Sequence, residues 1–275
     1  RIRLVLDHSP EITDLVLDDP EENGDEKDVL TFQDVSFRFA DAEEYTLRNL
    51  NFTCRRGETT AIIGGTGSGK STVASLILRF HDATEGALLL NGTDIRQMTQ
   101  QFLRDHLSYV QQKAWLFSGT IADNLRYSRK NATEEELMHA ADVAQAGDFI
   151  RSLPNGLNSY VAQGGTNFSG GQKQRLSIAR ALVRKPDIYV FDDSFSALDF
   201  KTDATLRKEL KKETGDAIVM VVAQRISSIM EADRIVVLNE GNVIGTGTHR
   251  ELLKNCEIYK EIALSQLSEE ELAHE

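Results

Sequence analysis

The sequence has 275 residues and a formal net charge of −12, and this length allows one large domain, or one domain with subdomains, around a sizeable core. The acidity lies near the ends, because residues 7–28 hold ten acidic side chains against one lysine and the last seven residues hold four glutamates. No basic cluster suits nucleic acid, Cys54 and Cys256 form neither a disulfide framework nor a zinc site, and no apolar run reaches the ~18 residues of a membrane span.

The first elements of the chain are predicted from their apolar spacing. Residues 1–7 have the pattern of the end of an amphipathic helix, and an acidic linker follows as far as residue 28. Three segments then alternate apolar and polar side chains, which predicts half-exposed antiparallel strands at 30–32, 35–39 and 50–54. We therefore expect a small β layer ahead of residue 59.

A glycine-rich segment from Gly64 to Thr72 fits the phosphate-loop pattern G-x-x-x-x-G-K-[ST]. It lies between a β-branched strand pattern at 59–63 and helical apolar spacing at 73–80, which is the context that the motif requires. Such a loop turns its backbone N–H groups toward phosphate oxygens, and the helix adds its positive N-terminal end. A chance glycine-rich turn is the alternative, and the flanking elements disfavour it. The loop residues expected to bind ATP are Gly64, Thr66, Gly67, Ser68, Gly69, Lys70, Ser71 and Thr72.

Two side chains of this loop have specific expected roles. Lys70 would reach the β- and γ-phosphates, and the hydroxyl of Ser71 would bind Mg²⁺. The predicted ligand is therefore a nucleotide with β- and γ-phosphates, bound with Mg²⁺.

The later elements alternate between strands and helices. A capping box at Thr133 and Glu136 opens a helix to residue 145, and Ser169 opens a second helix to about residue 184. Near-continuous apolar runs predict buried parallel strands at 188–191, 218–222 and 235–238. Other expected elements are strands at 87–90 and 107–110 and helices at about 202–213 and 248–267. The predicted fold class is α/β, a P-loop (RecA-like) ATPase core with an antiparallel β subdomain and an inserted α-helical subdomain.

Two adjacent aspartates follow the predicted strand at 188–191. Asp192, at the C-terminal tip of this strand, would hold Mg²⁺ opposite Ser71. Asp193 would lie beside the γ-phosphate, where a base or a water-positioning group is needed. A solvated strand end is the alternative reading, and the phosphate loop earlier in the chain weakens it.

The segment from Asn167 to Arg175 contains the most specific pattern of the sequence. Its Ser169-Gly170-Gly171-Gln172 run places a hydroxyl and exposed N–H groups at a helix start, where an anion is favoured. Here the chain resembles the ATP-binding cassette (ABC) family, whose signature is L-S-G-G-Q, with Phe168 in place of leucine. The resemblance covers about residues 1–267.

The resemblance implies further roles. Gln112 is similar to the Q-loop glutamine, a metal ligand and catalytic residue, and Asp199 to the D-loop aspartate. Phe39 is similar to the adenine-stacking aromatic residue, with Tyr45 as the competing candidate. The family forms head-to-tail dimers, so Ser169, Gly170, Gly171 and Gln172 would contact the ATP bound to a second nucleotide-binding domain.

Residues 116–121 and 1–7 resemble the exporter branch, in which the N-terminal segment continues from the last transmembrane helix. This implies a membrane-spanning domain outside the sequence and a location at the cytoplasmic face of the cell membrane. Trp115 either contacts that membrane part or packs within the domain. The expected boundaries are 1–28 for the membrane-domain connection and linker, 29–268 for the nucleotide-binding domain and 269–275 for an acidic tail. Within the domain they are about 29–111 and 185–247 for the β subdomain and core, about 112–184 for the helical subdomain and 248–267 for the C-terminal helices.

The chain departs from the family pattern at positions near the γ-phosphate. Asp193 stands for the catalytic glutamate, and Gln224 stands for the switch histidine. Gln163 stands for a glutamate at the face toward the membrane part, and Gly65 and Gln111 replace prolines. Because Asp193 is a shorter base than glutamate and Gln224 is a neutral amide, we predict MgATP binding with slow ATP hydrolysis.

Together these departures resemble the degenerate half of a bacterial heterodimeric multidrug-type exporter. We expect the catalytic group to be Asp193, Gln224 and Gln112, with faster chemistry at the partner's loop. Neutral drift of the two positions is one alternative. A regulatory ATP clamp with negligible hydrolysis and a non-transport cassette ATPase are the other two.

Overall fold

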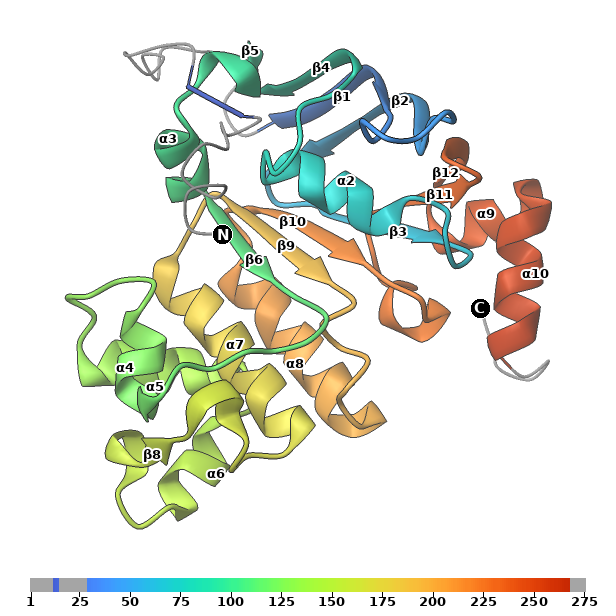
Figure 1. The fold of residues 1–275 in the computed structure, drawn as a ribbon. Coiled ribbons are helices and arrows are strands. Elements are labelled where there is room, and N and C mark those ends of the chain that lie inside the picture. Colours follow the sequence, from blue (N-terminus) through green and yellow to red (C-terminus); the bar gives the residue numbers. More distant parts are fainter. Residues whose placement is uncertain (1–11, 15–28, 268–275) are drawn as a thin grey trace.

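The computed structural model describes residues 12–14 and 29–267 (Figure 1). The predicted helix end at 1–7, most of the acidic linker and the tail at 269–275 lie outside the described residues. None of the helices in the described part is long and apolar enough to cross a bilayer.

A six-stranded sheet forms the centre of the fold, in the order β12-β11-β3-β10-β9-β6 (Figure 1). All neighbouring strands are parallel except the edge pair β11 and β12. The predicted buried strands are thereby confirmed. The bounds are β3 Thr59–Gly64, β6 Leu107–Val110, β9 Ile188–Asp192, β10 Ile218–Val222, β11 Arg234–Asn239 and β12 Asn242–Gly247.

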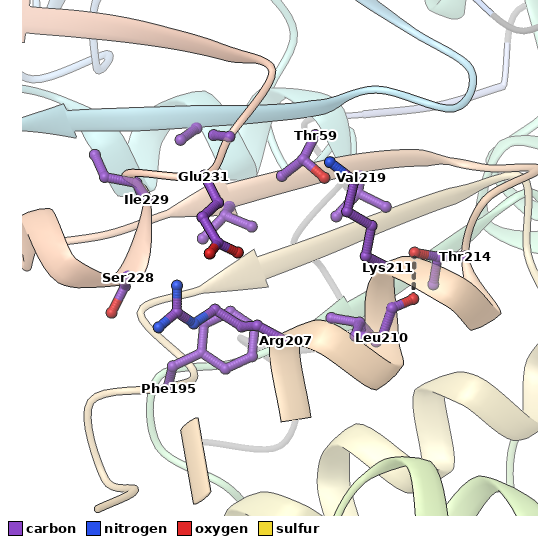
Figure 2. A pocket seen from close by; sticks show the side chains of 13 residues that line it. Thr59, Phe195, Arg207, Leu210, Lys211, Thr214, Val219, Ser228, Ile229 and Glu231 are labelled. Atoms are coloured by element: carbon purple, nitrogen blue, oxygen red, sulfur yellow. Dashed lines mark hydrogen bonds between the residues drawn. The ribbon is translucent and has the colours of Figure 1, made fainter. Parts of the chain in front are cut away.

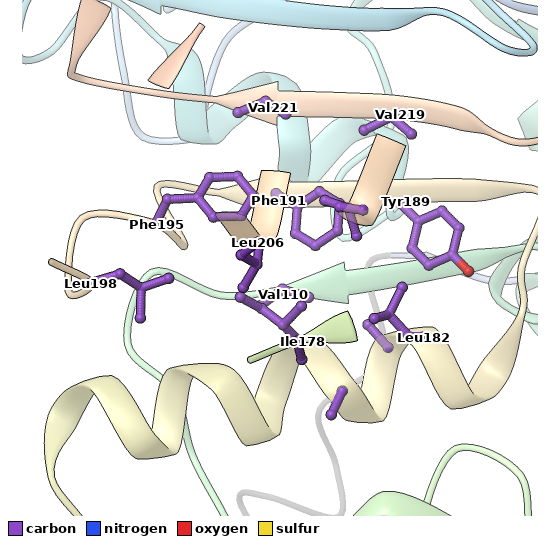
Figure 3. Close-up of a cluster of buried hydrophobic side chains, with 14 of the residues drawn as sticks. Val110, Ile178, Leu182, Tyr189, Phe191, Phe195, Leu198, Leu206, Val219 and Val221 are labelled. Atoms are coloured by element: carbon purple, nitrogen blue, oxygen red, sulfur yellow. The ribbon is translucent and has the colours of Figure 1, made fainter. Parts of the chain in front are cut away.

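The parallel strands of this sheet are buried on both faces, which explains their unbroken apolar runs. In β9, Ile188 and Val190 pack into one core together with the β layer and the helix that follows the phosphate loop. Tyr189 and Phe191 point the other way, into a second core that includes residues of the long helices below the sheet (Figure 3).

A second, antiparallel sheet has the order β2-β1-β4-β5 and forms the expected β layer. The prediction of separate strands at 30–32 and 35–39 was wrong, because both segments belong to one strand with an irregular register. Asp34 lies at the irregularity with a φ of 51°, so that Phe32 and Val35 both face the core. The bounds are β1 Val29–Phe37, β2 Leu47–Arg55, β4 Glu85–Leu90 and β5 Thr93–Asp94.

The helix after the phosphate loop, α2, spans Lys70–Ile77 and lies between the two sheets (Figure 1). It ends before Phe80, earlier than its apolar spacing predicted. Arg79 leaves the helical conformation with a φ of 50° and is only 1% exposed. Its guanidinium binds Asp82, the carbonyl oxygen of Met98 at 2.8 Å and, at 3.4 Å, that of Thr13.

A group of helices lies on the side of the central sheet away from the β layer (Figure 1). The predicted capping box at Thr133 and the predicted helix start at Ser169 are confirmed, and Ser169 with Gln172 also forms a capping box. The helices here are α4 Ile121–Arg126, α5 Glu134–Val143, α6 Gly147–Ser152, α7 Gly170–Arg184 and α8 Phe200–Glu213, beside a small sheet of β7 Gly119–Thr120 and β8 Tyr160–Val161. The remaining helices are α3 Gln100–Asp105, α9 His249–Asn255 and α10 Glu257–Gln266, and the short turns are η1 Ile95–Gln97, η2 Gly156–Asn158, η3 Gln163–Gly165 and η4 Ile226–Ser228.

Candidate functional site

The phosphate loop passes through two positions that only glycine fits. A Cβ atom on Gly64 would lie 2.1 Å from the carbonyl oxygen of Leu238, because the loop leaves β3 against the neighbouring strand. Gly69, at the start of α2, has a φ of 99°, and its Cβ would lie 2.5 Å from Leu47. These glycines let the backbone curl tightly between β3 and α2.

Lys70 is held inside the curl of the loop. Its Nζ donates to the carbonyl oxygens of Gly64 at 2.8 Å and Gly65 at 2.7 Å. Burial lowers the pKa of Lys70, while the charges of Asp193 and Asp192 oppose that shift. Hydrogen bonds from an ammonium to an anion are stronger than those to carbonyl oxygens. The Lys70 ammonium can therefore exchange its carbonyl partners for an anionic ligand.

The loop borders a groove of about 590 Å³. This volume lies within the range of small-molecule sites, roughly 300 to 1,000 Å³. The mainly apolar hollow between α8 and strands β3 and β10 encloses only about 50 Å³, which is too small for a nucleotide (Figure 2). The groove is lined by residues Gly64 to Thr72, Thr46, Gln224, Ile262, Ser265 and Gln266.

Asp192 ends β9 and is nearly buried. The hydroxyl of Tyr109, on the neighbouring strand β6, donates to Asp192 Oδ2 at 2.9 Å. Burial raises the pKa of Asp192, and this hydrogen bond opposes the shift. The carboxylate is therefore oriented by a side chain that the sequence did not single out.

Asp193 brings the three predicted catalytic residues together. Its backbone has a φ of 46°, and its N–H donates to the carbonyl oxygen of Val222 at 2.8 Å. Asp193 Oδ2 accepts hydrogen bonds from Gln112 Nε2 at 2.8 Å and from Gln224 Nε2 at 3.1 Å. Burial raises the pKa of Asp193, and the bond from Gln112 opposes the rise.

The donor set at this end of β9 suits a magnesium ion that also binds phosphate. Mg²⁺ prefers oxygen ligands and commonly takes only one or two carboxylates, with phosphates and waters completing its shell. Asp192 offers a carboxylate, Ser71 an exposed hydroxyl and Gln112 an amide oxygen. Within the described residues there is no group of three His, Cys, Asp or Glu side chains that could hold a metal by itself.

The predicted signature residues do not join the groove. Ser169 and Gly170 are exposed at the start of α7, and Gly171 packs toward the carbonyl oxygen of Ala197. Ser169 Oγ accepts from the Gln172 backbone N–H, and Gln172 Oε1 accepts from the Ser169 N–H. Asp199 is the N-cap of α8, where its carboxylate accepts from the Thr202 N–H at 3.0 Å.

The two aromatic candidates for adenine stacking have different surroundings. Phe39 is 42% exposed and packs edge-on against Phe37 and His81. The Tyr45 hydroxyl donates to Glu85 at 2.6 Å, and the Arg38 guanidinium lies over its ring. Neither residue lines the groove at the phosphate loop, so stacking by either stays a prediction.

A second surface hollow, of about 610 Å³, has aromatic walls. Trp115 is 51% exposed there, and Phe117 and Tyr127 stack with their ring centroids 4.7 Å apart. Gln163 lines the same hollow. Gln163, which the exporter resemblance placed at the face toward the membrane part, therefore shares one surface with Trp115, and contact of Trp115 with a membrane part stays a prediction.

Sequence reasoning missed five residues around the nucleotide groove. Four of them line it and come from elsewhere in the chain, and the fifth orients Asp192. No local pattern marks them, because each reaches the site through the packing of distant elements. They are Thr46, Tyr109, Ile262, Ser265 and Gln266.

Three comparisons with known proteins agree with this geometry. The sequence profile of the ABC transporter family matches residues 47–196. The chain is 48% identical over 241 residues to an uncharacterized ABC transporter ATP-binding protein of Mycobacterium bovis, covering 86% of this chain and 41% of that relative. It is 41% identical over 228 residues to a putative multidrug export ATP-binding/permease protein of Staphylococcus aureus, covering 83% and 39%.

A solved structure extends the likeness to the fold. A bacterial Atm1-family ABC exporter with ATP bound has a TM-score of 0.90 and 36% identity, covering 98% of this chain and 46% of that chain. The predicted fold class is thereby confirmed. The chain spans about two fifths of the length of the curated relatives that it matches.

Proposed function

The chain belongs to the ABC transporter family, and from that premise we propose that it is the ATP-binding and hydrolysing motor domain of an exporter. MgATP would drive its dimerisation at the cytoplasmic face of the membrane and so power export. The observation that carries this proposal is the groove of about 590 Å³ between the phosphate loop and Gln224.

The residues of the groove account for nucleotide binding. The loop N–H groups and the N-terminus of α2 would hold the phosphates, and Lys70 would exchange its carbonyl partners for phosphate oxygens. Ser71, Asp192 and Gln112 would hold Mg²⁺, which neutralises phosphate charge when bound. Tyr109 keeps the Asp192 carboxylate in place.

We further propose that this chain's own site turns over slowly. A base must reach the attacking water, and Asp193 is one methylene shorter than the glutamate of the family pattern. Its Oδ2 atom is also shared by two amide donors, Gln112 and Gln224. Neither amide can take up a proton at neutral pH.

The partner would be a second nucleotide-binding domain on a different chain. The exposed Ser169 and Gly170, with Gly171 and Gln172 behind them, would complete that partner's site, and Asp199 would lie at the same interface. The aromatic hollow at Trp115 and Gln163 would receive the membrane-spanning part. The subdomain boundaries at about 111–112 and 184–185 belong to this proposal.

A regulatory ATP clamp is the second candidate function. It is favoured by the two amide donors on Asp193, which stabilise a carboxylate without activating water. The clamp and the slow motor differ only in whether hydrolysis exceeds the uncatalysed rate.

MgATP titration of the 275-residue protein by calorimetry, followed by a phosphate-release assay, tests the proposal. We expect saturable binding and slow hydrolysis above background. Binding without measurable hydrolysis would favour the clamp. Absence of MgATP binding in a folded sample would refute both.

A further inference from the structure

The side chain of Gln266, the last residue of α10, forms two hydrogen bonds with the backbone of the loop that follows β10. Its Nε2 donates to the carbonyl oxygen of Gln224 at 2.9 Å. Its Oε1 accepts from the backbone N–H of Ile226 at 2.8 Å. One side-chain amide therefore satisfies two backbone groups that lie on either side of Arg225.

The loop needs such a partner, because its own sequence does not cap the turn that follows. The short turn η4 begins at Ile226, and its N-cap residue, Arg225, makes no side-chain capping bond. Uncapped N–H groups at a helix start require an outside acceptor. Gln266 supplies that acceptor from a helix about forty residues later in the chain.

The helix that carries Gln266 is firmly placed. Tyr259 and Ala263 of α10 are fully buried in the core below the central sheet. Within one helical turn after Ala263, Ser265 and Gln266 line the nucleotide groove together with Gln224. The packing of α10 therefore fixes the place of Gln266, and Gln266 in turn holds the loop backbone.

We propose that Gln266 is a positioning residue, which fixes the backbone at 224–226 so that the Gln224 side chain points to Asp193. This inference rests on the proposed function, because it assigns Gln266 to the same nucleotide site. The Gln224 amide donates to Asp193 Oδ2 only while its backbone stays in place. Displacing the end of α10 would release Gln224 from Asp193 without altering the phosphate loop.

Three variants of the chain distinguish the roles of the two hydrogen bonds made by the Gln266 side chain. Gln266→Ala removes both, and Gln266→Glu keeps an acceptor for Ile226 while removing the donor to Gln224. Glu261→Gln is the matched control, because Glu261 is exposed on the same helix and does not line the nucleotide groove. The two readouts are hydrogen exchange at the Ile226 amide and the NMR resonances of the Gln224 side-chain amide, assigned with Gln224→Ala.

In Gln266→Ala we expect at least about fivefold faster exchange at Ile226 and shifted Gln224 side-chain resonances. Gln266→Glu should preserve Ile226 protection and still shift the Gln224 resonances, and Glu261→Gln should leave both unchanged. If Gln266→Ala speeds exchange at Ile226 but leaves the Gln224 resonances unchanged, Gln266 is only a stabilising contact and the proposal is overturned. No change at either site would also overturn it.

A third readout places the effect in the nucleotide site. Gln266→Ala should change kcat for MgATP in the same direction as Gln224→Ala does, with KM nearly unchanged, and it should have no further effect in a Gln224→Ala background. An equal change in both backgrounds would contradict action through Gln224. Neither NMR readout requires nucleotide, so a chain that fails to bind MgATP would refute the proposed function while leaving the Gln266 contact testable.

Discussion

Gln224 and Asp193 are joined by one hydrogen bond, in which Gln224 Nε2 donates to Asp193 Oδ2 at 3.1 Å. These are the two positions at which the sequence departs from the family pattern of glutamate and histidine. Gln112 donates to the same oxygen at 2.8 Å. Asp193 and Gln224 are therefore in direct contact, and a change at either position alters the hydrogen-bond partner of the other.

Restoring the family residues should therefore raise ATP turnover most when both positions are changed together. We expect the double variant Asp193→Glu with Gln224→His to raise ATP turnover at least about tenfold, since a positioned base contributes roughly 10²- to 10⁴-fold. Each single variant should gain less than half of that effect in free energy, because the partner group is mismatched. A phosphate-release assay under conditions where dimerisation is shown measures the gain, and Asp193→Asn is the negative control. An unchanged rate in the double variant would contradict the slow-site proposal.

Removing the Lys70 charge should weaken MgATP binding more than it weakens the fold. Lys70→Ala deletes the ammonium that the loop carbonyls hold at 2.7 and 2.8 Å. We expect MgATP affinity to fall about 10- to 100-fold, because hydrogen bonds to charged groups contribute roughly 1.5 to 3 kcal/mol. Calorimetry measures this loss against Lys254→Ala, an exposed lysine of α9. Equal affinities of the two variants would exclude Lys70 from the phosphate site.

Two adjacent glycines of the loop should respond differently to one added methyl group. The Cβ of Gly64→Ala would lie 2.1 Å from the Leu238 carbonyl oxygen, whereas the Cβ of Gly65→Ala meets nothing within 4 Å. We expect Gly64→Ala to lower the free energy of unfolding by about 3 kcal/mol or more, and Gly65→Ala to change it by less than about 1 kcal/mol. Urea denaturation compares the pair. Similar stabilities would show that the loop can move away from β11.

The first turn of α5 should contribute to acid sensitivity. The Thr133 N–H and then the Arg129 side chain lower the pKa of Glu136 below its ordinary value. The resulting stabilisation is complete above the ordinary pKa and is lost as the pH falls through the lowered pKa of the folded state. In urea titrations between about pH 6 and pH 3, Glu136→Gln should lose less stability on acidification than the parent chain. Glu134→Gln, in the same turn, is the control, and a parent-like pH profile for Glu136→Gln would contradict the assignment.

The sequence predicts those parts of the fold that depend on neighbours along the chain. The buried strands follow from apolar runs such as 218–222, and helix starts follow from signals such as the capping box of Thr133. The phosphate loop is marked by a local motif, although the space at Gly64 and Gly69 is limited by Leu238 and Leu47 from distant strands. These elements agree with the structure within a few residues.

The remaining features depend on contacts between distant segments. The irregular register at Asp34 merges two predicted strands, and no local pattern marked it because alternation alone reads as two short strands. Tyr109 meets Asp192 across two strands, and Gln266 meets Gln224 from another helix. Periodicity assigns a side chain to a face, but only the assembled packing determines which partner it meets.

The buried side chain of Arg79 connects the C-terminal end of α2, the helix after the phosphate loop, to another segment of the chain. Its guanidinium lies 3.7 Å from Asp14 and 3.4 Å from the carbonyl oxygen of Thr13, while Lys70 begins the same helix. The eight residues of α2 span about 12 Å, and Arg79 lies two residues beyond the end of this helix. Arg79 therefore connects Thr13 and Asp14 to the helix that begins at Lys70, and Arg79→Met would remove this connection.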